Sequence, residues 1–81
     1  MHPQRGMEIT AQLLGPIGDG LSPRECEVVR HVALGLRNAE VGATLLISEN
    51  TVRKHLQNVF VKLGLRRRTQ LAGYALRVGL V

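Results

Sequence analysis

Helix start and stop signals recur at short intervals along this chain and leave room only for short helices. The run SPRE at 22–25 is a capping box, in which the serine side chain accepts from the glutamate amide and the glutamate side chain accepts from the serine amide. Its proline falls at the first helical position, where the missing N–H costs nothing. Ser48 can cap a later helix, and Gly35, Gly64 and Gly79 can each end one in the left-handed conformation.

Between these signals the apolar residues follow the period of a helix, and no segment alternates as a strand would. After the first helix, which Gly35 ends, Asn38 is expected to cap a second, short helix that runs to Thr44. The third helix is expected at 49–63 and the fourth at roughly 68–78. The predicted fold class is therefore all-α, with four helices.

The length of 81 residues allows one domain at most, and we assign it to residues 21–81. Residues 1–20 are expected to be a flexible leader or linker. Within them the segment 7–14 could form two helical turns, but the sequence GPIGDG at 15–20 breaks any continuous structure.

The charge balance indicates which partners the chain favours. Eleven Lys and Arg against six Asp and Glu give a formal net charge of +5, which favours nucleic acid or an anionic membrane surface. A single cysteine cannot form an internal disulfide, so a disulfide-stapled secreted domain is not expected. No apolar run approaches the ~18 residues that a membrane-spanning helix needs, and the amino-terminal segment lacks the pattern of a signal peptide. We therefore expect a cytoplasmic domain that binds no membrane.

The expected third helix has two distinct faces. Val52, Leu56, Val59 and Leu63 fall on one stripe, with Phe60 beside it, and this stripe is predicted to enter the core. The opposite face collects polar and basic side chains and one valine: Asn50, Arg53, Lys54, Gln57 and Val61, with Asn58 and Lys62 beside them. Such side chains can reach the base edges and phosphates of DNA, although any surface helix also has a polar face.

Three further features favour nucleic acid over a merely solvated surface. No acidic residue lies along the centre of the polar face, since Glu49 sits to the side in the first turn, where the helix dipole favours it. A short helix and a tight apolar turn precede the third helix, as a helix-turn-helix requires. The run at 66–68 adds arginines where the helix end would approach phosphates. The sequence thus predicts double-stranded DNA binding, with 49–63 entering the major groove.

Four segments in order also match a known family. LSPRECEVV (21–29), GLRNAEVGATLLIS (35–48), NTVRKHLQNVFVKLGL (50–65) and RRTQLAGYAL (67–76) resemble the LuxR-type, or GerE/FixJ-type, helix-turn-helix domain of bacterial transcription regulators. The resemblance implies the sequence-specific DNA-binding output domain of a regulator. It also implies an amino-terminal receiver or ligand-binding sensor domain outside this chain, as in response regulators, and makes RNA polymerase a candidate partner.

The resemblance assigns roles to residues one by one. In the family the residues after the Thr-Val pair point into the major groove; here these are Arg53 and Lys54, with Gln57 one turn on, and all three are expected to contact bases. Contacts to the DNA backbone are expected from polar and basic residues in and around the helix: Ser48, Asn50, Thr51, Asn58, Lys62, Arg66 and Arg67.

Three positions depart from the family's pattern: Cys26, which stands where relatives often carry a charge, and two that bear on the helices themselves. Gly42 stands where the family usually has alanine, and a glycine within a helix costs about 1 kcal/mol. Arg67 replaces the short polar cap that usually precedes the fourth helix. None of these changes removes a residue expected to face DNA, so all three bear on local stability alone.

The expected fourth helix carries a wider apolar arc than one core contact needs, which often marks a second buried surface. In the family this helix commonly forms a dimer on DNA. The residues expected to approach a partner chain are Gly73, Tyr74 and Arg77, and those expected to pack inward are Ala72, Ala75 and Leu76. A two-fold homodimer would contact half-sites about one helical turn of DNA apart.

Other functions are less favoured. The spacing of Cys26, His31 and His55 matches no zinc pattern, and Cys26 and His31 lie too far around one helix to form a nucleophile–base pair. We therefore expect no metal, no cofactor and no enzymatic activity, and Cys26 is interpreted as a packing residue, with a redox role left open.

A protein-interaction or dimerisation module without DNA binding is the main alternative. A membrane-surface helix is disfavoured because the apolar side of the third helix is needed in the core.

Overall fold

The computed structural model describes residues 20–81 of the chain, so the helical turns expected within 7–14 lie outside the described residues. Residues 20–81 form four helices and no strand: α2 (Pro23–Ala33), α3 (Asn38–Leu45), α4 (Glu49–Leu63) and α5 (Arg68–Val78). The predicted all-α class with four helices is confirmed. None of the described helices has the length and apolar content that crossing a membrane requires.

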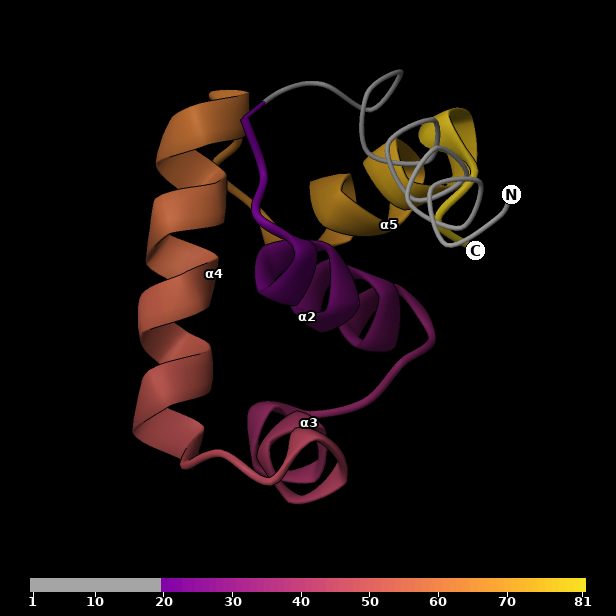
Figure 1. Ribbon diagram of the computed structural model, residues 1–81. Helices are drawn as coiled ribbons and strands as arrows, with labels where there is room; N and C mark the ends of the chain where they lie inside the picture. The colour runs from indigo at the N-terminus through magenta and orange to yellow at the C-terminus, as the bar shows by residue number, and fades with distance from the viewer. Residues whose placement is uncertain (1–19) are drawn as a thin grey trace, which may run out of the picture.

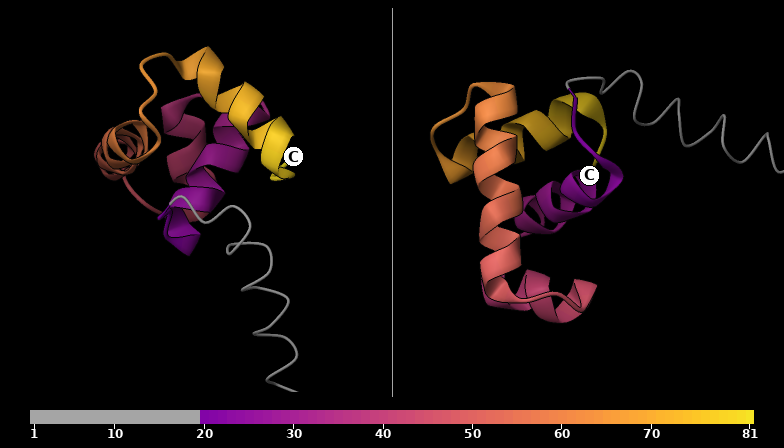
Figure 2. Two further views of the ribbon diagram at one scale, coloured as in Figure 1. Left: turned by 90° about the horizontal axis from the view of Figure 1, so that it is seen from above. Right: turned by 60° about the vertical axis from the view of Figure 1, so that its left-hand side comes forward.

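Helix α2 lies at the centre of the arrangement. It packs against α3, α4 and α5, whereas α3 packs mainly on α4 and α5 mainly on α2. In Figure 1, α4 runs along one side of the molecule with α3 at its start. The left view of Figure 2 looks almost along the axis of α4, which stands beside the other helices with one side uncovered. The helix predicted to bind DNA therefore lies at the edge of the fold.

The core is almost entirely aliphatic. Its largest fully buried side chains come from all four described helices: Val28, Val29, Val41, Val52, Val59 and Leu71. Leu56 is also buried, and Phe60 and Leu63 pack against the core while staying partly exposed. The apolar stripe predicted for the third helix is therefore the buried side of α4.

Two helices begin as their capping residues predict. At α2, the Glu25 amide donates to Ser22 Oγ at 3.1 Å and the Ser22 amide donates to Glu25 Oε1 at 2.8 Å, which completes the capping box. At α4, the Thr51 amide donates to Ser48 Oγ at 3.0 Å. These local bonds satisfy amides that have no partner within the helix.

Helix α3 begins differently from the prediction. Arg37 is the residue that precedes the helix, in an extended conformation, and Asn38 is already helical, so the expected cap by Asn38 is wrong. The Glu40 carboxylate instead accepts from the Arg37 amide at 2.7 Å. This bond from the third helical residue starts the helix without a short polar cap. Helix α3 also extends one residue beyond Thr44, to Leu45.

All four described helices end on one hydrogen-bond pattern, in which an amide beyond the helix donates to a carbonyl five residues earlier. The amide–carbonyl pairs are Leu36–His31, Ile47–Gly42, Leu65–Phe60 and Leu80–Ala75, at 2.8 to 3.1 Å. Three of these ends place a glycine at positive φ, and they are the predicted Gly35, Gly64 and Gly79. The end of α3 places Leu46 there, with φ of 60°.

The turn between α3 and α4 is therefore strained and tight. A left-handed conformation costs an L-residue about 1–2 kcal/mol, and the Leu46 side chain, 90% exposed, gains no packing in return. A Cβ on Gly42 would lie 2.6 Å from the Ile47 carbonyl oxygen. Gly42, which weakens an isolated helix, thus lets this turn fold closely back onto α3.

Replacing Leu46 with glycine should raise the free energy of unfolding by about 0.5–1 kcal/mol, because relief of left-handed strain exceeds the added freedom of the unfolded chain. Urea denaturation followed by circular dichroism measures the change. Leu46→Ala is the matched control, since it removes the exposed side chain but keeps the Cβ that causes the strain. If the glycine and alanine variants are equally stable, the claim that the backbone at Leu46 is strained is contradicted.

Candidate nucleic-acid interface

The first turn of α4 is organised by its own hydroxyl groups. Ser48 Oγ accepts from the Thr51 amide and lies 2.8 Å from Thr51 Oγ1, within hydrogen-bond distance. Ser48 is exposed and Thr51 is half-buried. Both residues were predicted to contact the DNA backbone, and the structure adds that they hold the start of the helix.

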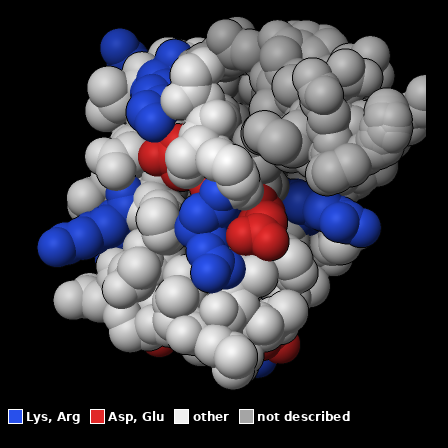
Figure 3. All heavy atoms as spheres, viewed as in Figure 1, with Lys and Arg blue, Asp and Glu red and all other residues white. Residues whose placement is uncertain are grey.

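The side of α4 that faces away from the core is exposed along the helix. We call it the α4 outer face, and its exposed residues are Asn50, Arg53, Lys54, Gln57, Asn58 and Val61. It includes the three residues predicted to contact bases, all of them accessible to a partner. Seen as in Figure 1, basic side chains project from the side along which α4 runs (Figure 3).

The three predicted base-contacting side chains differ in how firmly they are held. Arg53 donates from one terminal nitrogen to Asn50 Oδ1 at 3.0 Å and from the other to Glu49 Oε2 at 3.0 Å. Lys54 and Gln57 make no side-chain hydrogen bond or ion pair within the described residues. Arg53 is thus oriented before any ligand arrives, while Lys54 and Gln57 are free to adjust.

Lys62, which was predicted to contact the DNA backbone, makes two bonds within the fold. Its ammonium donates to Glu25 Oε1 at 2.7 Å and to the Gly20 carbonyl at 3.0 Å. These bonds join the last turn of α4 to the start of α2, across 37 residues of sequence. We call this contact the Glu25–Lys62 clamp.

The carboxylate of the Glu25–Lys62 clamp is the buried charged group of the described core, with 4% of Glu25 exposed. Burial acts to raise the pKa of Glu25, but the Lys62 ammonium and the Ser22 amide outweigh it, so the pKa lies below its ordinary value. The carboxylate is therefore ionised at neutral pH, and it depends on Lys62 for its compensating charge.

The arginines that follow α4 have separate roles. Arg66 and Arg67 are exposed, and their backbone amides both donate to Gln70 Oε1, at 2.8 and 2.9 Å. Their guanidinium groups make no bond within the described residues and can reach outward. Gln70 supplies the cap that Arg67 itself cannot, so the departure noted at Arg67 does not leave the start of α5 unsatisfied.

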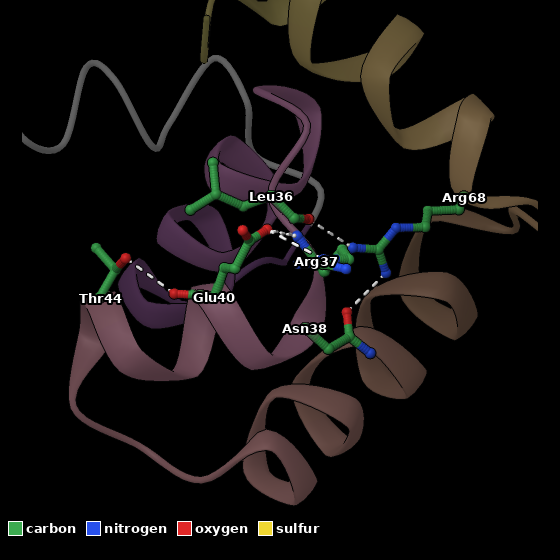
Figure 4. Close-up of polar contacts among 6 residues, drawn as sticks. All are labelled: Leu36, Arg37, Asn38, Glu40, Thr44 and Arg68. Carbon is green, nitrogen blue, oxygen red and sulfur yellow. Dashed lines mark hydrogen bonds and ion pairs between the residues drawn. The ribbon is translucent and has the colours of Figure 1, made fainter.

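Arg68 instead joins two parts of the fold. Its guanidinium donates to Asn38 Oδ1 at 2.7 Å and to the Leu36 carbonyl at 2.9 Å. Figure 4 shows the side chain reaching from α5 to the loop before α3 and to the first residue of that helix. Sequence reasoning did not find this contact or the Glu25–Lys62 clamp, because no local pattern signals a bond between residues 30 or 37 apart.

Helix α5 is rotated relative to the prediction. Tyr74 is 6% exposed and belongs to the core, so it offers a partner chain almost no surface, while Leu76, expected to pack inward, is 68% exposed. Ala75 is buried as expected, Gly73 is half-buried and Arg77 is exposed. The apolar side of α5 that stays open is therefore centred on Leu76. The cause is the position of α2, which covers the side of α5 that carries Leu71, Tyr74 and Ala75.

Cys26 is buried among the core residues. Burial raises the pKa of its thiol, and the neighbouring carboxylates of Glu25 and Glu27 raise it further. A thiol in this setting stays protonated and is a poor nucleophile, so the structure favours a packing role for Cys26.

Comparison with known proteins places the whole of this interface within one matched region. Residues 19–75, more than half of the chain, match the family described as bacterial regulatory proteins, luxR family. The chain is 44% identical over 59 residues to the transcriptional regulatory protein LnrK of Bacillus subtilis, which is 73% of this chain and 27% of that protein. It is 42% identical over 55 residues to the CsgBAC operon transcriptional regulatory protein of Escherichia coli, which is 68% of this chain and 26% of that protein.

A third relative is much longer. The chain is 46% identical over 59 residues, 73% of its length, to a putative HTH-type transcriptional regulator of Mycobacterium bovis, of which it covers 7%. The chain thus spans about a quarter or less of the length of these curated relatives.

Replacing Lys62 with methionine should lower the free energy of unfolding at pH 7 by about 2 kcal/mol. Loss of one partner of a fully buried pair costs about 3–5 kcal/mol, and we expect less because the Lys62 side chain is 37% exposed. Chemical denaturation measures the change. Lys54→Met is the matched control and should stay within about 0.5 kcal/mol of the unmodified chain.

The same pair of variants tests the pH dependence. Because the pKa of Glu25 is lowered by folding, its carboxylate stabilises the fold above its ordinary value of 4.5, and this contribution is lost as the pH falls through the folded-state pKa. The stability difference between the unmodified chain and Lys62→Met should therefore narrow in acid. If Lys62→Met and Lys54→Met lose equal amounts of stability at pH 7, the stabilising role of the Glu25–Lys62 clamp is contradicted.

Proposed function

The chain belongs to the luxR family of bacterial regulatory proteins, and we propose that it binds double-stranded DNA sequence-specifically by placing the α4 outer face in the major groove. One observation carries this proposal. Burial of Val52 and Leu56 turns Arg53, Lys54 and Gln57 to the exposed side of the same helix. Arg and Lys side chains pair with guanine and Gln with adenine, and an α-helix fits the major groove.

Contacts to phosphates would position this helix. We assign them to exposed or half-buried polar residues at both ends of α4 and along its edge: Ser48, Asn50, Thr51, Asn58, Arg66 and Arg67. The net charge of +5 supports attraction to a polyanion. Lys62 is left out of this set because its ammonium is engaged in the Glu25–Lys62 clamp.

A homodimer through α5 is the second part of the proposal. Leu76 is the large apolar side chain exposed on this helix, and Gly73 and Arg77 lie on the adjoining surface. A partner chain that covered Leu76 would remove this apolar area from water. A two-fold dimer would then present two α4 helices to half-sites about one turn of DNA apart.

The chain would act by binding, as the output domain of a longer cytoplasmic transcription regulator. The relatives with which it shares this region are named as transcriptional regulators, and the chain covers 27% and 26% of two of them. An amino-terminal receiver or sensor domain would then control when the domain binds DNA, and RNA polymerase would be the machinery it affects.

Replacing Lys54 with alanine should weaken binding by about 1–3 kcal/mol for duplexes that keep the preferred base at one position, and by little for duplexes that lack it. Arg66→Ala is the matched control, because loss of a phosphate contact should weaken all sequences alike and make the dependence on log salt shallower by about one unit. Fluorescence anisotropy with duplexes selected from a random pool measures both effects.

Two outcomes of this experiment count against the proposal in different ways. Equal weakening of selected and random duplexes by Lys54→Ala would refute base recognition by Lys54. Negligible duplex binding by the unmodified chain at low salt would refute DNA binding altogether and favour a protein-interaction module.

Replacing Leu76 with glutamate should weaken dimer formation about tenfold or more, because a charge would enter an apolar contact. Sedimentation analysis with and without a two-half-site duplex measures the association. Leu34→Glu, at an exposed leucine after α2, is the matched control and should leave it unchanged. If the two variants associate equally well, the α5 interface is wrong.

A further inference from the structure

Arg53 is held at both ends of its guanidinium group by residues of the first turn of α4. Glu49 lies four residues earlier and Asn50 three residues earlier, and each accepts a bond of 3.0 Å. The Glu49–Arg53 pair is about half-exposed on both sides, so a large ligand can reach it. Glu49 thus has a direct effect on one predicted base-contacting residue.

We propose that Glu49 is a specificity-determining residue. It orients the Arg53 side chain for contact with a base edge, and it offsets the Arg53 charge so that Arg53 binds phosphates less strongly. The inference rests on the proposed function, since it concerns how the α4 outer face selects among DNA sequences. Glu49 itself acts through Arg53 and is a positioning residue.

The electrostatic part of the argument concerns random DNA. A free arginine binds a phosphate of any sequence, through charge-assisted and often bidentate bonds. The Glu49 carboxylate, 3.0 Å from the Arg53 terminal nitrogen, offsets that charge and is itself repelled by phosphates. Glu49 therefore lowers the affinity of the domain for duplexes that lack the preferred bases.

The geometric part concerns the preferred sequence. A guanidinium group has five N–H donors, and the bonds to Glu49 and Asn50 use two of them. The others can meet the two acceptors on the major-groove edge of guanine. Because the side chain is already oriented, less conformational freedom is lost when the base contact forms. Affinity for the preferred sequence is therefore largely kept, and the ratio of specific to random binding rises.

The chain contains a matched pair for the control. Arg24 and Glu27 form a similarly exposed ion pair on α2, with a distance of 3.4 Å. Replacing either Glu49 or Glu27 with glutamine raises the net charge by one and releases one arginine from a carboxylate. The two variants differ in whether that arginine lies on the α4 outer face.

The experiment compares Glu49→Gln, Glu27→Gln and the unmodified full chain on two duplexes, one selected from a random pool by the unmodified chain and one of random sequence. Glu49→Gln should bind the random duplex about tenfold more tightly, with a salt dependence steeper by about one unit of log K per log salt, because Arg53 gains a phosphate. Its affinity for the selected duplex should change by less than about threefold, so specificity falls. Glu27→Gln should leave the salt dependence and the specificity ratio unchanged. Thermal melting of all three chains confirms that each is folded at the assay temperature.

Equal changes in affinity for both duplexes in Glu49→Gln and Glu27→Gln would overturn the inference. Glu49 would then affect binding only through its contribution to the net charge of the chain. An unchanged specificity ratio in Glu49→Gln would overturn it too. Failure of the proposed function would look different, because the unmodified chain would then select no duplex at all.

Discussion

The buried stripe of α4 is the constraint on which the rest of the structure depends. Val52 and Val59 are fully buried and Leu56 is nearly so, and burial of each such side chain contributes about 1.5–3 kcal/mol. Rotating the helix about its axis would expose these residues and bury Arg53 or Lys54 without a partner, at a larger cost. Burial of this stripe in the core therefore determines which side chains of the helix lie on the α4 outer face.

Packing fixes the rotation of α4, and polar contacts fix its ends. The Glu25–Lys62 clamp joins its last turn to the start of α2, and the close turn at Gly42 joins its first turn to α3. Arg68 ties the beginning of α3 to α5. A binding face on a helix held at both ends loses little freedom on contact with a ligand, which favours precise recognition of a partner surface.

Local signals in the sequence were sufficient for the helices and for the two faces of α4. Ser22 and Ser48 start helices and Gly64 ends one by interactions within a few residues, so their patterns are visible in the sequence itself. The outer position of Arg53 follows from the same periodicity. The predicted cap by Asn38 is wrong because the Arg37 amide donates to the Glu40 carboxylate, so the helix begins one residue earlier.

Contacts between distant residues could not be predicted in this way. Nothing near Lys62 in the sequence reveals its bond to Glu25, and the bond of Arg68 to Asn38 joins residues that are equally remote. The orientation of α5 depends on where α2 lies. The prediction therefore placed Tyr74 on the surface and Leu76 in the core, whereas Tyr74 is buried and Leu76 is exposed. The periodicity of a helix with apolar residues on most sides does not specify which side is covered.

The most direct test of the account is a nuclear magnetic resonance titration of the isotope-labelled chain with a duplex that it selects. If the α4 outer face enters the major groove, the largest shift changes should fall on the backbone and side-chain signals of Arg53, Lys54 and Gln57, while buried residues such as Val29 change little. Changes concentrated on α2 or α5, with the signals of α4 unmoved, would contradict the central claim.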